Sequence, residues 1–173
     1  MVPRLLLRKT PIVSDGPPEP VERVNAFLRE ARAEARIEEF AKGTPTAAHA
    51  ARAVGCDLRN IVKSLVFECD GRVALAMVPG DRRADSAKVA RASGARSASI
   101  ASPDRVRETT GFEPGAVAPF GLARVDVVLL ERTLLGLDRV WVGGGSTRHM
   151  VGLAPVELVR LSRAAPLDII GDD

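Results

Sequence analysis

The spacing of apolar residues predicts a helix near the start of the chain. Val21, Val24 and Leu28 recur at helical intervals, while charged residues fall mostly on the opposite side, as expected of a helix with one buried face. We expect the helix to begin after Pro20. The closely spaced prolines before that point indicate a loose N-terminal arm over residues 1–20.

Two apolar runs separated by Asp70-Gly71 form the clearest strand pattern. Residues 61–69 and 72–78 are rich in branched and apolar side chains, and an Asp-Gly pair between such runs is the strongest short-range indication of a β-hairpin. The sequence therefore predicts a hairpin in the middle of the chain.

The rest of the pattern alternates between short strands and short helices. Strands are predicted at residues 36–40, 125–130, 140–142 and 150–153, and helices at 46–55, at 85–93, from Ser102 and from Pro155. Strands joined by both hairpins and helices predict an α/β domain with a mixed, largely antiparallel sheet flanked by helices. We expect this single domain to span residues 21–169, with residues 170–173 as a tail.

Composition narrows the class of protein. The chain has 173 residues, of which 46% are hydrophobic, enough for a real core. Only 3% are aromatic, which argues against a nucleic-acid platform of stacked rings. The formal charge of +3 comes mostly from arginine, which binds phosphate well, so an RNA partner is permitted but not required.

The two cysteines, Cys56 and Cys69, belong to no CxxC pair or His/Cys cluster. We therefore expect no disulfide framework, no metal and no cofactor, and a reducing cytoplasm is the simplest location. No segment approaches the length needed to span a membrane, so we expect no membrane association.

Lys63 stands out in the first hairpin strand. In an extended strand alternate residues share a face, so Lys63 is expected beside Ile61, Leu65 and Phe67. A charge among apolar side chains is unfavourable unless it finds an anion or reaches water. Lys63 is therefore either a lysine whose head is solvated or a pocket residue that meets a substrate phosphate or carbonyl.

The segment GFEPGAVAPFG, residues 111–121, is the second candidate. Three glycines and two prolines in eleven residues exclude a regular helix and a central strand. Such a loop exposes backbone N–H groups, which can stabilise the negative charge that develops on a carbonyl oxygen during acyl transfer. The alternative is a purely structural connection.

Other polar features are less specific. Residues 143–145 are three glycines after a predicted buried strand, without the spacing of a P-loop, and are expected to bend the chain beside the first loop. His49 and His149 show no metal spacing and no catalytic triad. Glu131 is placed at the end of a strand, as a partner for Lys63 or as an exposed charge.

Together these segments resemble a known family. The order of IVKSLVF, the Asp-Gly hairpin, DSAKVARASGA, TGFEPGAVAPFG and VWVGGGSTRHMVGLAP is similar to the YbaK family of single-domain aminoacyl-tRNA deacylases, related to the editing domain inserted in bacterial prolyl-tRNA synthetases. The resemblance covers residues 21–169 and implies a barrel-like sheet with a pocket for the aminoacyl end of tRNA.

The resemblance also implies site residues. It assigns catalysis to Lys63 and Gly115. Residues implied to bind substrate are Ser64, Gly111, Pro119, Phe120, Gly121, Glu131, Gly144, Gly145 and His149. Two departures concern specificity: some members carry Asp-Glu where this chain has Leu130-Glu131, and an acidic residue where it has His149-Met150.

The implied activity is hydrolysis of mischarged aminoacyl-tRNA in trans, including tRNA-Pro carrying a small amino acid. A triad is not needed, because the ester is already activated and orientation with oxyanion stabilisation supplies most of the catalysis. The implied partners are aminoacyl-tRNA and an aminoacyl-tRNA synthetase. Two alternatives stay open: a non-catalytic module that binds charged tRNA or a synthetase, and a hydrolase of small free esters or amides.

Overall fold

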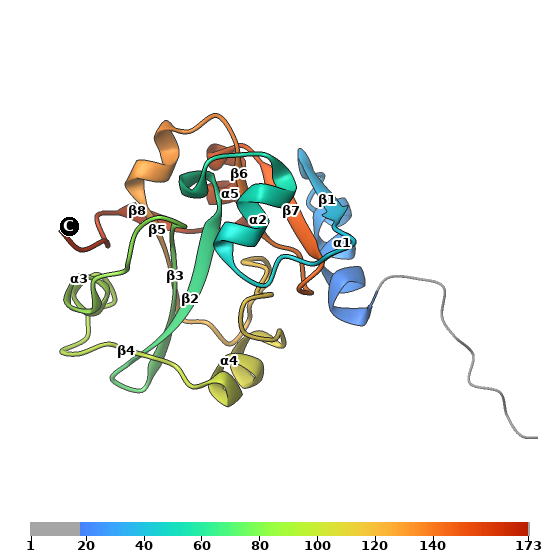
Figure 1. Ribbon diagram of the computed structural model, residues 1–173. Coiled ribbons are helices and arrows are strands. Elements are labelled where there is room, and N and C mark those ends of the chain that lie inside the picture. Colours follow the sequence, from blue (N-terminus) through green and yellow to red (C-terminus); the bar gives the residue numbers. More distant parts are fainter. Residues whose placement is uncertain (1–17, 173) are drawn as a thin grey trace, which may run out of the picture.

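The computed structural model describes residues 18–172 (Figure 1). Most of the predicted N-terminal arm, residues 1–17, lies outside this range. The described helices are α1 (Glu19–Glu30), α2 (Ala47–Val54), α3 (Ser86–Ala92), α4 (Pro103–Thr110) and α5 (Pro155–Ser162), with short 3-10 turns at Leu58–Asn60 and Arg132–Gly136. No helix in this range is long and apolar enough to cross a membrane.

The strands form two sheets, confirming the mixed α/β class. They are β1 (Ala35–Glu39), β2 (Val62–Cys69), β3 (Arg72–Pro79), β4 (Ser99–Ile100), β5 (Val127–Glu131), β6 (Val140–Gly143), β7 (His149–Leu153) and β8 (Ala165–Leu167). One sheet has the order β4-β2-β3-β5-β8 and the other β1-β7-β6. The β3–β5 and β5–β8 pairs are parallel and the others antiparallel, as the largely antiparallel prediction requires.

The barrel-like arrangement is wrong in one respect: the described strands do not close into a barrel. The two sheets are joined only at their margin, through an isolated parallel bridge between Ile61 and Trp141. The sequence pattern missed β4 and β8, the edge strands of the larger sheet, because two or three residues are too few to show alternation.

The hairpin is confirmed, with Val62 opposite Pro79 and Cys69 opposite Arg72. Asp70 and Gly71 both have positive φ, of 52° and 82°, which is the geometry of the tight turn that matches the twist of paired strands. The first helix begins at Glu19 rather than after Pro20. Proline is tolerated in the first helical turn because its missing N–H would have no partner there.

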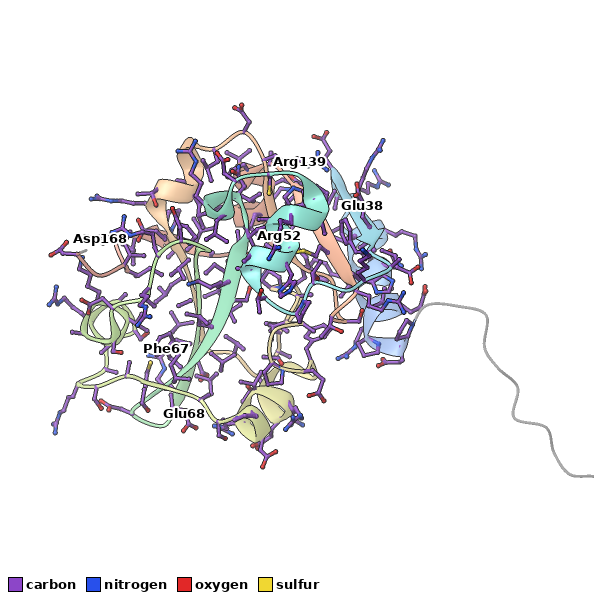
Figure 2. The ribbon with its side chains drawn as sticks, viewed as in Figure 1. Glu38, Arg52, Phe67, Glu68, Arg139 and Asp168 are labelled. Atoms are coloured by element: carbon purple, nitrogen blue, oxygen red, sulfur yellow. The ribbon has the colours of Figure 1, made fainter. Side chains whose placement is uncertain are left out.

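The larger core lies between the two sheets. It joins Val66 and Met77 of the five-stranded sheet to Val142 and Val151 of the three-stranded sheet, and α1, α4 and α5 add side chains to it. A second core on the opposite face of β2 and β3 is covered by α3 and the C-terminal segment, and includes Phe67. Figure 2 draws the side chains on the ribbon and labels Phe67.

Strand β2 therefore has two buried environments. Val62 and Val66 point into the larger core, whereas Phe67 and Cys69 point into the second. Because side chains alternate along a strand, Lys63 and its neighbour Ser64 are directed to opposite faces of the sheet. This difference decides how each of them can meet a ligand.

Candidate functional site

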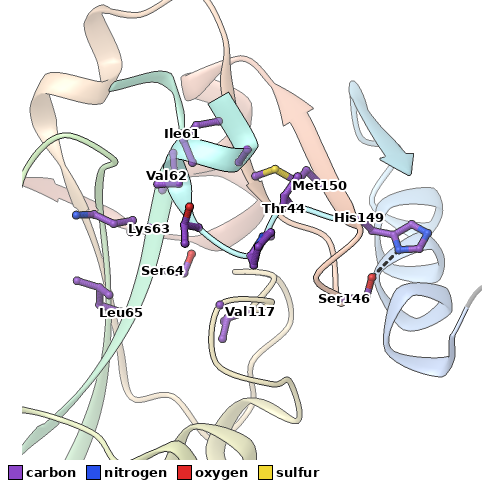
Figure 3. Close-up of a pocket in the computed structure, with 16 residues that line it drawn as sticks. Thr44, Ile61, Val62, Lys63, Ser64, Leu65, Val117, Ser146, His149 and Met150 are labelled. Carbon is purple, nitrogen blue, oxygen red and sulfur yellow. Dashed lines mark hydrogen bonds between the residues drawn. The ribbon is translucent and has the colours of Figure 1, made fainter. Parts of the chain in front are cut away.

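A pocket of about 250 Å³ opens beside the first residues of β2 (Figure 3). Its walls come from α2 and the segment before it, from β2, from the 111–121 loop and from the turn between β6 and β7. The lining residues are Thr44, Pro45, Thr46, Ala47, Ala50, Ile61, Val62, Lys63, Ser64, Leu65, Gly115, Val117, Gly143, Ser146, His149 and Met150. Four of the predicted site residues, Lys63, Ser64, Gly115 and His149, are thus brought together.

The hydroxyl of Ser64 is the most unusual polar group in this pocket. Its Oγ is buried and has no hydrogen-bond partner within residues 18–172. Leaving a buried hydroxyl unpaired costs about 1–3 kcal/mol, so such a group in a pocket wall is suited to a ligand that completes its hydrogen bonding.

The loop contributes backbone donors to the same wall. Gly115 and Val117 line the pocket, and their N–H groups donate no hydrogen bond to the described part of the chain. The intervening N–H of Ala116 donates to the Glu113 carbonyl at 3.0 Å. Gly115 has a φ of +83°, which a residue with a side chain rarely adopts, and this conformation shapes the loop where it meets the pocket.

The glycine-rich turn lies against this loop, as the sequence predicts. A Cβ on Gly143 would overlap the carbonyl of Val117, and a Cβ on Gly145 would lie 2.8 Å from the Pro20 oxygen. The Gly145 N–H donates to the Ala116 carbonyl at 3.1 Å. The glycines therefore allow a close approach of backbones that fixes the loop, while Gly144 packs against the His149 backbone.

Helix α1 holds both ends of the loop. The Arg23 guanidinium donates to the Gly111 carbonyl at 3.0 Å and lies 4.7 Å from the centre of the Phe112 ring. At the other end, Phe27 stacks on Phe120 with ring centres 5.6 Å apart. Sequence reasoning missed this role, because these contacts join α1 to a loop that lies far along the chain.

Pro119 and Gly121 do not reach the pocket. They line a separate surface cleft beside Phe27, and a Cβ on Gly121 would lie 3.0 Å from the Phe27 ring. Gly111 ends α4 in the left-handed conformation. The predicted residues at the loop ends therefore position the loop, and its middle faces the pocket.

Lys63 lies at the edge of the pocket and extends to the other side of β2 from Val117 (Figure 3). Its Nζ donates to the Arg82 carbonyl at 2.5 Å. Burial lowers the pKa of this ammonium, the nearby charge of Arg83 lowers it further, and Asp81 acts in the opposite direction. The alternation argument holds for two of the three predicted neighbours: Lys63 is half-buried on the apolar face that carries Leu65 and Phe67. Ile61 instead packs with Trp141 and Met150 in a third cluster.

His149 is buried at the start of β7. Its Nδ1 lies 2.6 Å from the Oγ of Ser146, which also accepts a hydrogen bond from the Arg148 N–H at 3.0 Å. His49, the other histidine, pairs with the Thr46 hydroxyl that caps α2. Sequence reasoning missed Thr44, Thr46 and Ser146 as pocket residues, because isolated hydroxyl side chains carry no distinguishing spacing.

Glu131 lies away from this pocket. It is 1% exposed, and its two carboxylate oxygens accept hydrogen bonds from the N–H groups of Thr133, at 3.2 Å, and Ile169, at 2.8 Å. The carboxylate is therefore neither an exposed strand end nor placed in the pocket wall with Lys63. It ties the C-terminal segment to the end of β5.

Comparison with known proteins identifies the family of this chain. A family model described as the aminoacyl-tRNA editing domain matches residues 41–161, which include β2, the 111–121 loop and the glycine-rich turn. The chain belongs to this family. The resemblance predicted from the sequence is confirmed. No group of three or more potential metal-binding side chains is present in the described range.

The relatives differ in how much of their own length the chain covers. Uncharacterized protein YwhH from Bacillus subtilis (strain 168) is 36% identical over 127 residues, covering 73% of this chain and 80% of YwhH. The proline–tRNA ligase of Pelotomaculum thermopropionicum is 27% identical over 119 residues, 69% of this chain. The chain spans about a fifth of the length of the ligases it matches.

A solved structure described as a candidate trans-editing enzyme for prolyl tRNA synthetase has the same fold. It superposes with a TM-score of 0.83 at 35% identity, over 91% of this chain and 100% of that chain. This agreement covers more of the chain than the residues 41–161 matched by the family model.

Proposed function

We propose that this editing domain hydrolyses the ester bond of mischarged aminoacyl-tRNA in trans. The proposal rests on the wall of the first pocket. There the Ser64 hydroxyl and the N–H groups of Gly115 and Val117 have no hydrogen-bond partner among residues 18–172. Membership of the aminoacyl-tRNA editing family supplies the class of ligand.

The chemistry uses positioned dipoles. Water attacks the carbonyl carbon of the ester. The carbonyl oxygen becomes negative, and the loop N–H groups stabilise that charge. The bond from the carbonyl carbon to the ribose oxygen then breaks, and that oxygen takes up a proton. The neighbouring ribose hydroxyl helps to orient the water, so the protein itself needs no nucleophile.

Lys63 supplies the positive charge at the edge of this site. Its ammonium donates to the Arg82 carbonyl, and a flexible four-carbon stem allows it to exchange that partner for a substrate phosphate. Arg83 lies close enough to lower the pKa of Lys63, so the edge is cationic and suited to an anionic ligand.

The substrate we propose is tRNA-Pro carrying a small amino acid. The pocket, at about 250 Å³, is small, and the relatives include proline–tRNA ligases and a candidate trans-editing enzyme for prolyl tRNA synthetase. A prolyl-tRNA synthetase is accordingly the proposed protein partner.

The test is release of amino acid from tRNA-Pro charged with Ala, Ser, Cys or Thr. We expect wild type to release at least one of them faster than buffer, and Lys63→Ala to lose this activity while keeping its melting temperature. Lys42→Ala, a lysine outside the pocket, is the matched control. Full activity of Lys63→Ala would remove Lys63 from the mechanism.

The same assay separates the competing functions. Binding of charged tRNA without release would indicate a non-catalytic module. Cleavage of small esters with no tRNA preference, and with no decline as salt rises, would indicate a small-molecule hydrolase, because contacts to phosphates weaken steeply with salt.

A further inference from the structure

A second pocket adjoins the first, with a volume of about 280 Å³. Every residue that lines it other than Ser64 is apolar. Its outer wall is formed by Ile100 of β4, by Pro103 and Val106 of α4, and by Pro114 of the loop. Ile100 is 60% exposed, so an apolar surface is presented at the mouth of this pocket.

The two pockets share one wall. Ser64, Leu65, Gly115 and Val117 line both, and they include the unpartnered hydroxyl and the free N–H groups assigned to the ester carbonyl. A ligand whose carbonyl lies at this wall therefore extends into one pocket on each side. An aminoacyl-adenosine ester has this shape, with the amino acid on one side of the carbonyl and the nucleoside on the other.

The chemistry of the pockets distinguishes the two parts. The first pocket is lined by residues with hydroxyl groups, Thr44, Thr46 and Ser146, which suit the hydrogen-bonding α-amino group of an amino acid. The second offers apolar contact area, which suits the flat face of a nucleobase. Its lining includes two prolines, whose rings are rigid.

No aromatic ring lines the second pocket. Proteins commonly hold unpaired bases by stacking them on such rings. In this chain the rings have other contacts: Phe27 with Phe120, Phe40 with Trp141, and Phe112 beneath Arg23, while Phe67 is 1% exposed. A base bound near the ester must therefore rest on aliphatic and proline side chains.

We propose that the apolar pocket between β4, α4 and Pro114 binds the terminal adenine base of the tRNA. The assignment rests on the proposed ester hydrolysis and adds the placement of the nucleoside. The proposal makes Ile100, on the exposed edge strand β4, a substrate-binding residue, although its side chain carries no polar or reactive group.

The test compares two esters of the same amino acid, alanyl-adenosine and alanine methyl ester, with Ile100→Asp. We expect the variant to raise KM for alanyl-adenosine about tenfold and to leave KM for the methyl ester unchanged. Val156→Asp is the matched control, because Val156 is an exposed apolar residue, 72% exposed, that lines neither pocket. It should affect neither ester.

An equal change in KM for both esters, or no change for either, would overturn the assignment. The three esters alanyl-, seryl- and threonyl-adenosine share the base and differ in the amino acid. A change in KM by Ile100→Asp that differs among them would also overturn the assignment. If wild type cleaves no ester, the proposed function fails. The base site is then tested by titrating adenosine monophosphate and observing the Ile100 and Val106 methyl signals, which must shift saturably.

Discussion

The two faces of strand β2 differ in how completely their polar groups are satisfied. On one face, Lys63 donates to the Arg82 carbonyl above a core that includes Phe67. On the other, Ser64 presents a buried hydroxyl without a partner to the 111–121 loop. Of these adjacent residues, Lys63 thus donates to a backbone carbonyl, whereas the Ser64 hydroxyl has no partner among residues 18–172. The side of the unpaired hydroxyl is where a ligand carbonyl gains most by binding.

The structure on the Ser64 face of β2 is held by more segments of the chain than the position of Lys63 is. The loop opposite it is held by the glycine-rich turn and by α1, whereas Lys63 depends on one carbonyl of the turn after β3. Catalysis by oriented N–H groups is sensitive to small displacements. Changes on the Ser64 face should therefore affect the reaction rate without altering the environment of Lys63.

The largest effect is expected from Gly143→Ala. Its Cβ would overlap the Val117 carbonyl, so the loop must move and its N–H groups lose their alignment. We expect kcat to fall about 100-fold or more, with little change in KM. Gly136→Ala is the control, since a Cβ there meets nothing within 4 Å. Wild-type kcat in Gly143→Ala would show that loop position does not matter.

Ser64→Ala should lower kcat about 10- to 100-fold, because a hydrogen-bond donor at the carbonyl is lost. The free energy of unfolding should stay the same or rise, since the hydroxyl has no partner in the described part of the chain. Ser162→Ala provides the contrast: its hydroxyl donates to Leu158 at 2.6 Å and accepts from Ala164. That variant should lose stability and keep activity, and the reverse result would refute the comparison.

Arg23→Ala should lower kcat about tenfold, because it releases one end of the loop from α1. Arg29→Ala is matched to it, since Arg29 lies on the same helix and pairs with Glu22, at 3.4 Å on the surface. Steady-state kinetics with alanyl-tRNA-Pro distinguish the two variants. Equal rates for both would remove α1 from the positioning of the loop.

The smallest effect concerns the pKa of Lys63. Burial and the charge of Arg83 lower it, whereas the hydrogen bond to Asp168 raises the pKa of Lys88. At pH values between the lowered pKa of the folded chain and the ordinary pKa of the unfolded chain, Lys63 binds more protons in the unfolded chain. Its contribution to the free energy of unfolding therefore rises with pH. Titration of ¹³C-labelled lysines by NMR should show Lys63 losing its proton first and Lys88 later; the opposite order would contradict the packing.

Sequence reasoning succeeded where one short pattern determines the structure. The Asp70-Gly71 turn identified the hairpin, and alternation placed Lys63 on an apolar face. It could not separate the roles of the glycine loop, because the ends and the middle have similar composition but different neighbours. Contacts such as Phe27 with Phe120 join residues far apart in the chain, and nothing local in either segment encodes them.

Glu131 shows what the local sequence pattern could not predict. Its position at the end of an apolar strand is consistent with an exposed charge or with a partner for Lys63, yet the carboxylate is buried under N–H groups of Thr133 and Ile169. The Ile169 partner comes from a C-terminal segment whose path over the sheet is set by tertiary packing. Burial of a charged group of this kind depends on donors that the local pattern does not show.

The central claim is that the substrate carbonyl binds at the wall formed by Ser64, Gly115 and Val117. The most direct test is an NMR titration of the ¹⁵N-labelled protein with an amide-linked analogue of alanyl-adenosine, which cannot be hydrolysed as an ester. The account predicts that the largest amide shifts occur at Gly115 and Val117. Shifts confined to residues around Arg82 on the other side of β2, with Gly115 and Val117 unchanged, would contradict it.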